Sequence, residues 1–165
     1  MYTKFWRMLT ATALALVAVS AAVAPVHAFD ARAKAAVNTN ADKIAIGGYD
    51  PVAYFTNNKP VAGSSAFKAA HEGATYQFAS AANRDAFVKE PAKFTPQYGG
   101  FCAYAASLGY KADVDPTAFK IVDNKLYLNY NHAVNKNWST DQANYIKKAD
   151  GKWSSIKDKA PAELR

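Results

Sequence analysis

The sequence predicts an α+β fold: one small domain with short antiparallel strands, a two-residue-turn hairpin at 119–130 and three or four helices. Three observations lead to this prediction. Residues 119–130 form two alternating apolar runs around Asp123-Asn124, residues 75–89 combine a strand pattern with a helix pattern, and 165 residues leave room for one domain. A chain of this size buries about two thirds of its unfolded surface, so it needs no disulfide.

The first 28 residues have the features of a secretory signal peptide. Lys4 and Arg7 precede an apolar stretch, and Val26-His27-Ala28 offers the small residues that signal peptidase accepts. We therefore expect cleavage after Ala28, a periplasmic or secreted location and no membrane span in the mature chain. Loss of the two basic residues lowers the net charge from +7 to +5.

The mature chain begins with a segment that is poor in large apolar side chains. Residues 29–45 are therefore expected to form a flexible leader, and the domain proper is expected to span 46–156. At its start, Asp50-Pro51 favours a turn, and the aromatic and β-branched residues that follow through Phe55 favour a strand.

The next segment reads as a strand followed by a helix. Residues 75–80 place Tyr76 and Phe78 on one strand face, and Ser80 is a good N-cap for a helix over 81–89. A short helix around 103–108, which Gly109 can end, is expected after an irregular loop.

The two-residue turn fixes the register of the 119–130 hairpin. It pairs Ile121 with Leu126 and Phe119 with Leu128, so these four apolar side chains lie on one face. A slip by one residue would break this agreement.

Helical spacing then extends over 132–150, with an interruption near Trp138-Ser139. Ser139 and Gln142 form a capping-box pattern for a second helix, which Gly151 can close. Residues 157–165 are expected to form a frayed tail.

The composition excludes several kinds of site. After signal cleavage the chain keeps one Cys and two His, which excludes Cys₂His₂ and Cys₄ zinc sites and a c-type haem site. Neither a P-loop nor a GxGxxG pattern is present. The lysines are scattered, which indicates a solvated basic surface and no nucleic-acid partner.

Five motifs occur in an order that resembles one family. They are YDPVAYF at 49–55, YQFAS at 76–80, the Asn, Arg, Phe and Pro pattern of 83–94, PQYGGFCA at 96–103 and KLYLNY at 125–130. Together they resemble an exported YHS domain protein. The small YHS module corresponds to roughly 49–98, and the longer exported version extends through Trp153.

The resemblance implies a link to heavy-metal handling, but the expected ligands are missing. YHS proteins provide thiolates from an Asp-Pro-Val-Cys segment and a Phe-Cys-Ser segment. This sequence has Ala53 and Ala79 at those positions, and Gln77 where a His often follows the Tyr. Alanine has no donor atom, so the soft thiolate site of the family cannot form.

Two candidate sites remain. The first is Cys102 with His71 and His132, the sole thiol–imidazole set of the mature chain, which would bind a copper or zinc ion. Cys102 follows a Gly-Gly pair near a helix N-terminus, and three interpretations of it stay open: a buried inert thiol, a reactive or metal-binding thiol, and an intermolecular disulfide.

The second candidate is an aromatic pocket around the Gly99-Gly100 loop, where glycines would let a ligand approach the backbone. Tyrosines can form its walls or can simply fill the core. The tyrosines concerned are Tyr49, Tyr54, Tyr76 and Tyr98.

These features favour a non-catalytic exported (periplasmic) binding or accessory protein that takes a small ligand or a metal ion. Its link to metal homeostasis would not use the usual YHS cysteine site. The alternative is a small thiol-dependent redox protein or enzyme that uses Cys102.

Overall fold

The computed structural model describes residues 30–164, so the predicted signal peptide and Arg165 lie outside the described residues. The fold is α+β, as predicted, with six α-helices and two antiparallel two-stranded sheets in this part of the chain. The elements follow in the order α1 (Ala53–Thr56), β1 (Ser64–His71), β2 (Ala74–Phe78), α2 (Ala81–Lys89), α3 (Pro91–Phe94), α4 (Ala103–Leu108), β3 (Asp115–Val122), β4 (Lys125–Asn129), α5 (His132–Trp138) and α6 (Gln142–Ile156), with 3-10 turns at Ile46–Gly48, Gln97–Gly100 and Pro161–Leu164.

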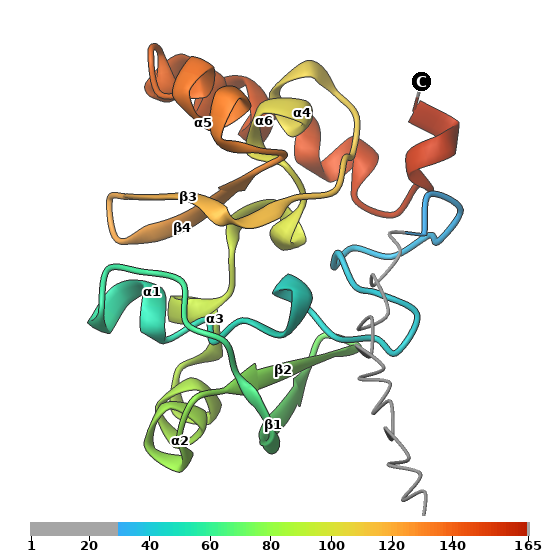
Figure 1. Cartoon of the computed structure of the whole chain (residues 1–165). Helices are drawn as coiled ribbons and strands as arrows, with labels where there is room; N and C mark the ends of the chain where they lie inside the picture. The colour runs from blue at the N-terminus through green and yellow to red at the C-terminus, as the bar shows by residue number, and fades with distance from the viewer. Residues whose placement is uncertain (1–29, 165) are drawn as a thin grey trace, which may run out of the picture.

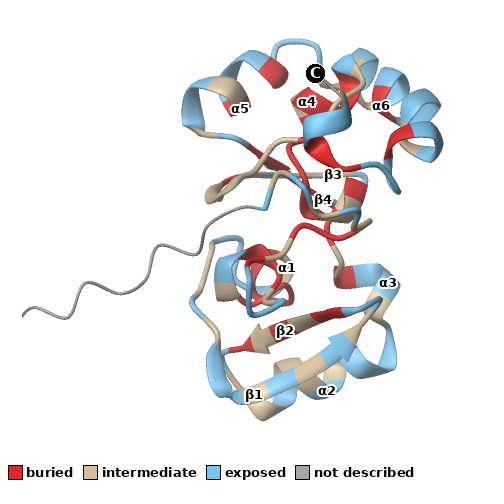
Figure 2. Ribbon diagram, turned by 90° about the vertical axis from the view of Figure 1, so that its right-hand side faces the viewer, coloured by how far each residue is buried: buried red, intermediate tan, exposed pale blue. Residues whose placement is uncertain are grey.

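The β3–β4 hairpin crosses the middle of the molecule, with β1, β2 and α1 to α3 on one side and α4 to α6 on the other (Figure 1). Successive side chains of β4 point to opposite faces. Leu126 and Leu128 belong to one hydrophobic core with Tyr54, whereas Tyr127 belongs to a second core with Trp138. In Figure 2 the exposed residues of α2, α5 and α6 lie on the outside of the molecule. The central hairpin thus joins the two cores.

The local predictions with a clear cap or turn are confirmed. Ser80 accepts a hydrogen bond from the backbone N–H of Asn83 at the start of α2. Gly109 ends α4 in the left-handed conformation. In the hairpin, Phe119 pairs with Leu128 and Ile121 with Leu126, as the two-residue turn requires.

The strand predicted after Asp50-Pro51 is wrong, because this segment forms the helix α1. The Asp50 carboxylate accepts hydrogen bonds from the N–H groups of Val52 and Ala53, which satisfies donors of the first helical turn. The strand preference of aromatic residues gives way to this cap and to burial of Tyr54 in the core.

Two further differences concern β1 and α6. β1 had no clear alternation in the sequence, yet it pairs with β2 along Lys68 to His71. α6 does not end at Gly151 and continues to Ile156. Its cap also differs, because Ser139 donates to the carbonyl of Asn135 and forms no capping box.

The segments predicted as a flexible leader (29–45) and a frayed tail (157–165) both contact the domain within the described residues 30–164. Val37 is buried, and the N–H of Asn38 donates to the carbonyl of Gly99. The N–H of Ala162 donates to the carbonyl of Ala31, so the two segments meet. Figure 1 shows the first described residues beside the C-terminal turn.

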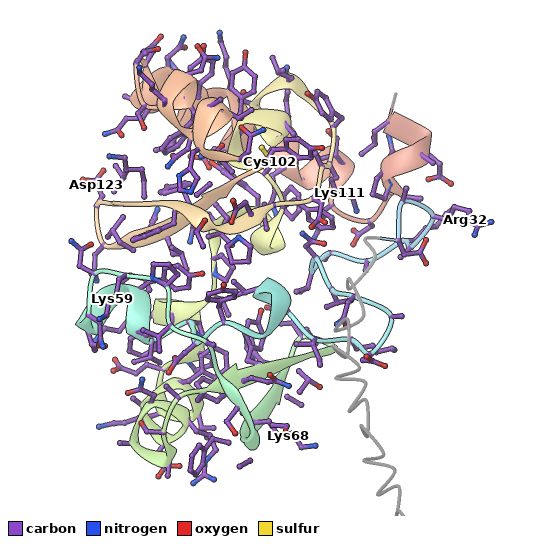
Figure 3. The ribbon with its side chains drawn as sticks, viewed as in Figure 1. Arg32, Lys59, Lys68, Cys102, Lys111 and Asp123 are labelled. Atoms are coloured by element: carbon purple, nitrogen blue, oxygen red, sulfur yellow. The ribbon has the colours of Figure 1, made fainter. Side chains whose placement is uncertain are left out.

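Lys111 holds these two segments together. Its side chain is fully buried, and its ammonium donates to the carbonyls of Ala35 and Lys157 at 2.9 Å each. The same ammonium lies 4.7 Å from the centre of the Phe101 ring. Burial lowers the pKa of Lys111, because the charged form is desolvated. Figure 3 places Lys111 on the side of the domain where the leader and the tail meet.

Across residues 30–164, no helix has the length and the apolar character that are needed to cross a membrane.

Candidate functional site

The three residues of the predicted metal site have different surroundings. Cys102 is buried beneath α4, and its thiol donates to Asn129 Oδ1 over 3.7 Å (Figure 3). His71 lies at the end of β1, edge-on to the Phe87 ring. His132 is exposed at the start of α5.

Cys102, His71 and His132 do not come together as metal ligands. The Nε2 atom of His132 lies 3.0 Å from Thr117 Oγ1, and that of His71 lies 3.8 Å from a Glu72 oxygen. Among residues 30–164, no group of three or more His, Cys, Asp or Glu side chains could hold a metal ion.

The thiol itself has the character of a core group. Burial raises the pKa of Cys102, although backbone hydrogen bonds from Ala105, Tyr130 and Tyr104 act in the opposite direction. A thiol with a raised pKa forms little of the reactive thiolate at neutral pH. This arrangement is that of a small apolar side chain rather than of a nucleophile.

The two alanines at the YHS cysteine positions lie around one carboxylate. The N–H of Ala53 donates to Asp50 Oδ1 at 3.3 Å, and the N–H of Ala79 donates to Asp50 Oδ2 at 2.8 Å. Asp50 also accepts from Val52 and from the Asn83 amide. The carboxylate is thus fully engaged by N–H donors, and neither alanine adds a ligand atom. The residues at this place do not fit a soft metal ion.

The predicted tyrosines do not form one pocket, although Tyr98 lines a hollow of about 380 Å³ together with Pro96 and Trp153. Tyr54 and Tyr76 are buried in the first core. The hydroxyl of Tyr98 donates to Asp150 Oδ1 at 2.9 Å. A side chain on Gly99 would overlap the carbonyl oxygen of Ala36, so the leader occupies the space that was expected for a ligand.

Tyr49 lines an open cleft of about 230 Å³. We call it the Asn40 cleft. Its walls come from the leader, from the turn before α1 and from the segment that enters β3. The polar side chains of the lining are Asn38, Thr39, Asn40, Tyr49 and Asp113. The apolar side chains are Ile44, Ile46, Val114 and Pro116.

Asn40 carries an unsatisfied group in this wall. Its Oδ1 atom accepts a hydrogen bond of 2.9 Å from the N–H of Ile44, which fixes the orientation of the amide. The Nδ2 atom is buried and has no hydrogen-bond partner. A buried donor without a partner costs about 1–3 kcal/mol, so native proteins rarely keep one without a reason.

The walls of the cleft are held by long-range contacts. Asn38 Nδ2 donates to Asp113 Oδ1 at 3.0 Å and to the carbonyl of Gly100 at 3.3 Å, which joins the leader to the segment before β3. Ile46 has a φ of +54°, which is unusual for a β-branched residue and costs on the order of 1–3 kcal/mol. Burial of its side chain in the first core compensates for this strain.

The sequence pointed to one member of this cleft, Tyr49, and missed the others. Asn38 and Asn40 lie in the leader, where a composition rich in Ala and Asn predicted weak attachment. Asp113 gives no local signal, because its contact with Asn38 joins residues 75 positions apart.

Comparisons of the chain with protein-family models, with curated proteins and with solved structures gave no significant match. The YHS resemblance of the five motifs stays a prediction.

Proposed function

We propose that the chain is a non-catalytic, exported binding protein of YHS type that holds a small ligand in the Asn40 cleft. The observation that carries this proposal is the unpartnered buried amide of Asn40 in the wall of an open cleft. The Nδ2 atom is closed to the cleft in this structure, so a ligand oxygen or nitrogen would supply the missing acceptor after a small shift of the Asn40 side chain. Pockets for small molecules commonly combine apolar walls with a few polar groups in this way.

The size of the cleft limits the ligand. At about 230 Å³ it lies below the roughly 300–1,000 Å³ that is usual for drug-sized ligands, so the ligand is a small metabolite or fragment. The thiol-dependent alternative has weaker support, because Cys102 is 1% exposed and its pKa is raised. A link to metal homeostasis rests only on the YHS resemblance.

Titration of the isotope-labelled mature protein with small amides tests the binding site. The panel contains neutral, cationic and anionic amides. We expect at least one of these charge classes to shift the backbone NMR signals of Ile44, Gly47 and Val114 at millimolar concentration. Val114→Phe narrows the cleft and should abolish these shifts. The matched control is Val88→Phe, because Val88 is 62% exposed on α2 and far from the lining.

A second variant guards against misfolding of the first. Asn40→Asp keeps the acceptor for the Ile44 N–H and replaces the unpartnered donor by an oxygen. It should weaken binding of the neutral amides that use their carbonyl oxygen as the acceptor. The proposal would be overturned if no probe caused shifts, or if the shifts occurred around Trp153 instead.

The predicted export has a separate test: mass spectrometry of the secreted chain should find Phe29 as the first residue.

A further inference from the structure

We propose that the Asn40 cleft selects small organic ammonium compounds, with Asp113 as the counter-ion. This inference rests on the proposed function and names the ligand class. Its basis is the charge of the lining, which contains one carboxylate, that of Asp113, and no Lys, Arg or His side chain.

The carboxylate of Asp113 is not neutralised by the protein. The ion pairs of residues 30–164 join other partners, and none of them includes Asp113. In this part of the chain its side chain accepts one hydrogen bond, from Asn38 Nδ2, which is a neutral donor. Asn38 cannot offer that nitrogen to a ligand as well, because its second N–H donates to the carbonyl of Gly100.

This arrangement discriminates between ligand charges. An anion would meet the Asp113 carboxylate without any cationic side chain to stabilise it. An ammonium group would form a charge-assisted hydrogen bond with the same carboxylate, and such bonds are about twice as strong as neutral ones. The ring of Tyr49 adds a second favourable group for an organic cation.

The other walls specify the rest of the ligand. Ile44, Val114 and Pro116 favour a short apolar spacer, and the Asn40 amide favours a hydrogen-bond acceptor at the far end. A divalent metal ion is a poorer occupant, because Ca²⁺ takes about six to eight oxygen ligands and Asp113 is the sole carboxylate of the lining.

Three amides of matched shape test the inference. β-Alaninamide carries an ammonium group, butyramide carries a methyl group at the same place, and succinamate carries a carboxylate. We expect β-alaninamide to bind about tenfold more tightly than butyramide, and succinamate to be the weakest of the three. Dissociation constants come from the NMR shifts of Gly47 and Val114 at low ionic strength, where electrostatic discrimination is strongest.

The variant that isolates the charge is Asp113→Asn. It keeps an oxygen for the hydrogen bond from Asn38 and removes the negative charge, so the preference for β-alaninamide over butyramide should fall to less than about twofold. The control Asp123→Asn removes an exposed carboxylate from the hairpin turn and should leave the preference unchanged (Figure 3).

The results separate this inference from the proposed function. Equal binding of the ammonium and methyl compounds would overturn the ammonium preference and leave a binding cleft. A preference that persists in Asp113→Asn would overturn the role of that carboxylate. Displacement of β-alaninamide by equimolar CaCl₂ would instead assign the site to a metal ion. The wild-type series decides between the ligand classes even if Asp113→Asn fails to fold.

Discussion

The carboxylate of Asp50 accepts a hydrogen bond of 2.6 Å from the side-chain amide of Asn83, and this contact joins the start of α1 to α2. Asp50 is fully buried, and N–H groups of Val52, Ala53 and Ala79 complete its surroundings. Four N–H donors thus replace the water that would solvate this carboxylate. Removing the acceptor leaves buried donors without partners.

Asp50→Ala is therefore expected to lower the free energy of unfolding by about 3–5 kcal/mol. Asn83→Ala removes one donor to a charged acceptor and should cost about 1.5–3 kcal/mol. Urea unfolding followed by circular dichroism measures both. The control is Asp85→Ala, an exposed carboxylate on the same helix, with an expected change within about 0.5 kcal/mol. An Asp50→Ala loss below that of Asp85→Ala would contradict the role given to this network.

Gly99 provides a test of how the leader is attached. Gly99 and Gly73 both have positive φ, of 59° and 76°, so an alanine meets similar backbone strain at either position. An added Cβ has no neighbour within 4 Å at Gly73, whereas at Gly99 it would overlap the carbonyl oxygen of Ala36. We expect Gly73→Ala to cost about 1 kcal/mol and Gly99→Ala about 2–4 kcal/mol.

The Gly99→Ala effect should be localised. Limited proteolysis should cut the 30–45 segment of Gly99→Ala faster than that of Gly73→Ala, because the displaced leader loses its contacts with the domain. Equal protection of the segment in both variants would show that Gly99 does not seat the leader.

The elements that the sequence predicts well are those whose determinants are local. Asp123 and Asn124 both adopt positive φ, as a two-residue hairpin turn requires, and the alternation on either side then sets the register. Ser80 caps α2 through a residue three positions away. Each of these signals is complete within a short window of sequence.

The elements that the sequence misses depend on distant partners. α1 forms around Asp50, whose other hydrogen bonds come from Ala79 and Asn83, 29 and 33 positions further along the chain. The Asn40 cleft depends on the contact between Asn38 and Asp113. No local pattern carries such information, so propensity favoured a strand at the first place and a loose leader at the second.

The buried tyrosines predict a loss of stability at alkaline pH. Burial raises the pKa of Tyr54, Tyr76 and Tyr98 above the ordinary value of 10.0. The folded protein therefore keeps phenol protons that the unfolded chain releases. Their contribution is complete below about pH 10 and is lost as the pH rises above that value.

A single variant isolates one of these phenols. Tyr76→Phe keeps the ring beside Phe87 and should reduce the alkaline loss of unfolding free energy by up to about 1.4 kcal/mol per pH unit. Urea unfolding between pH 8 and pH 11.5 measures the two slopes, with Tyr130→Phe at an exposed position as the control. Identical slopes for wild type and Tyr76→Phe would show that the Tyr76 phenol ionises over the same pH range in the folded protein as in the unfolded chain.

The burial of Cys102 predicts a thiol that is protected in the folded state. A disulfide reagent should modify it at least about a hundredfold more slowly in the native protein than in guanidinium chloride, because opening a core position costs several kcal/mol. Zn(II) or Cu(I) should not change the native rate, and neither should His71→Ala or His132→Ala, since the three side chains form no metal-binding group. In a Cys102→Ala background, Ala82→Cys places an exposed thiol on α2 and should react at the rate of the unfolded chain. Rapid reaction of Cys102 in the native protein, with an acid-shifted pH profile, would favour the redox alternative. If Zn(II) or Cu(I) slowed the reaction of the thiol, and either histidine variant removed this effect, the predicted copper or zinc site would be restored.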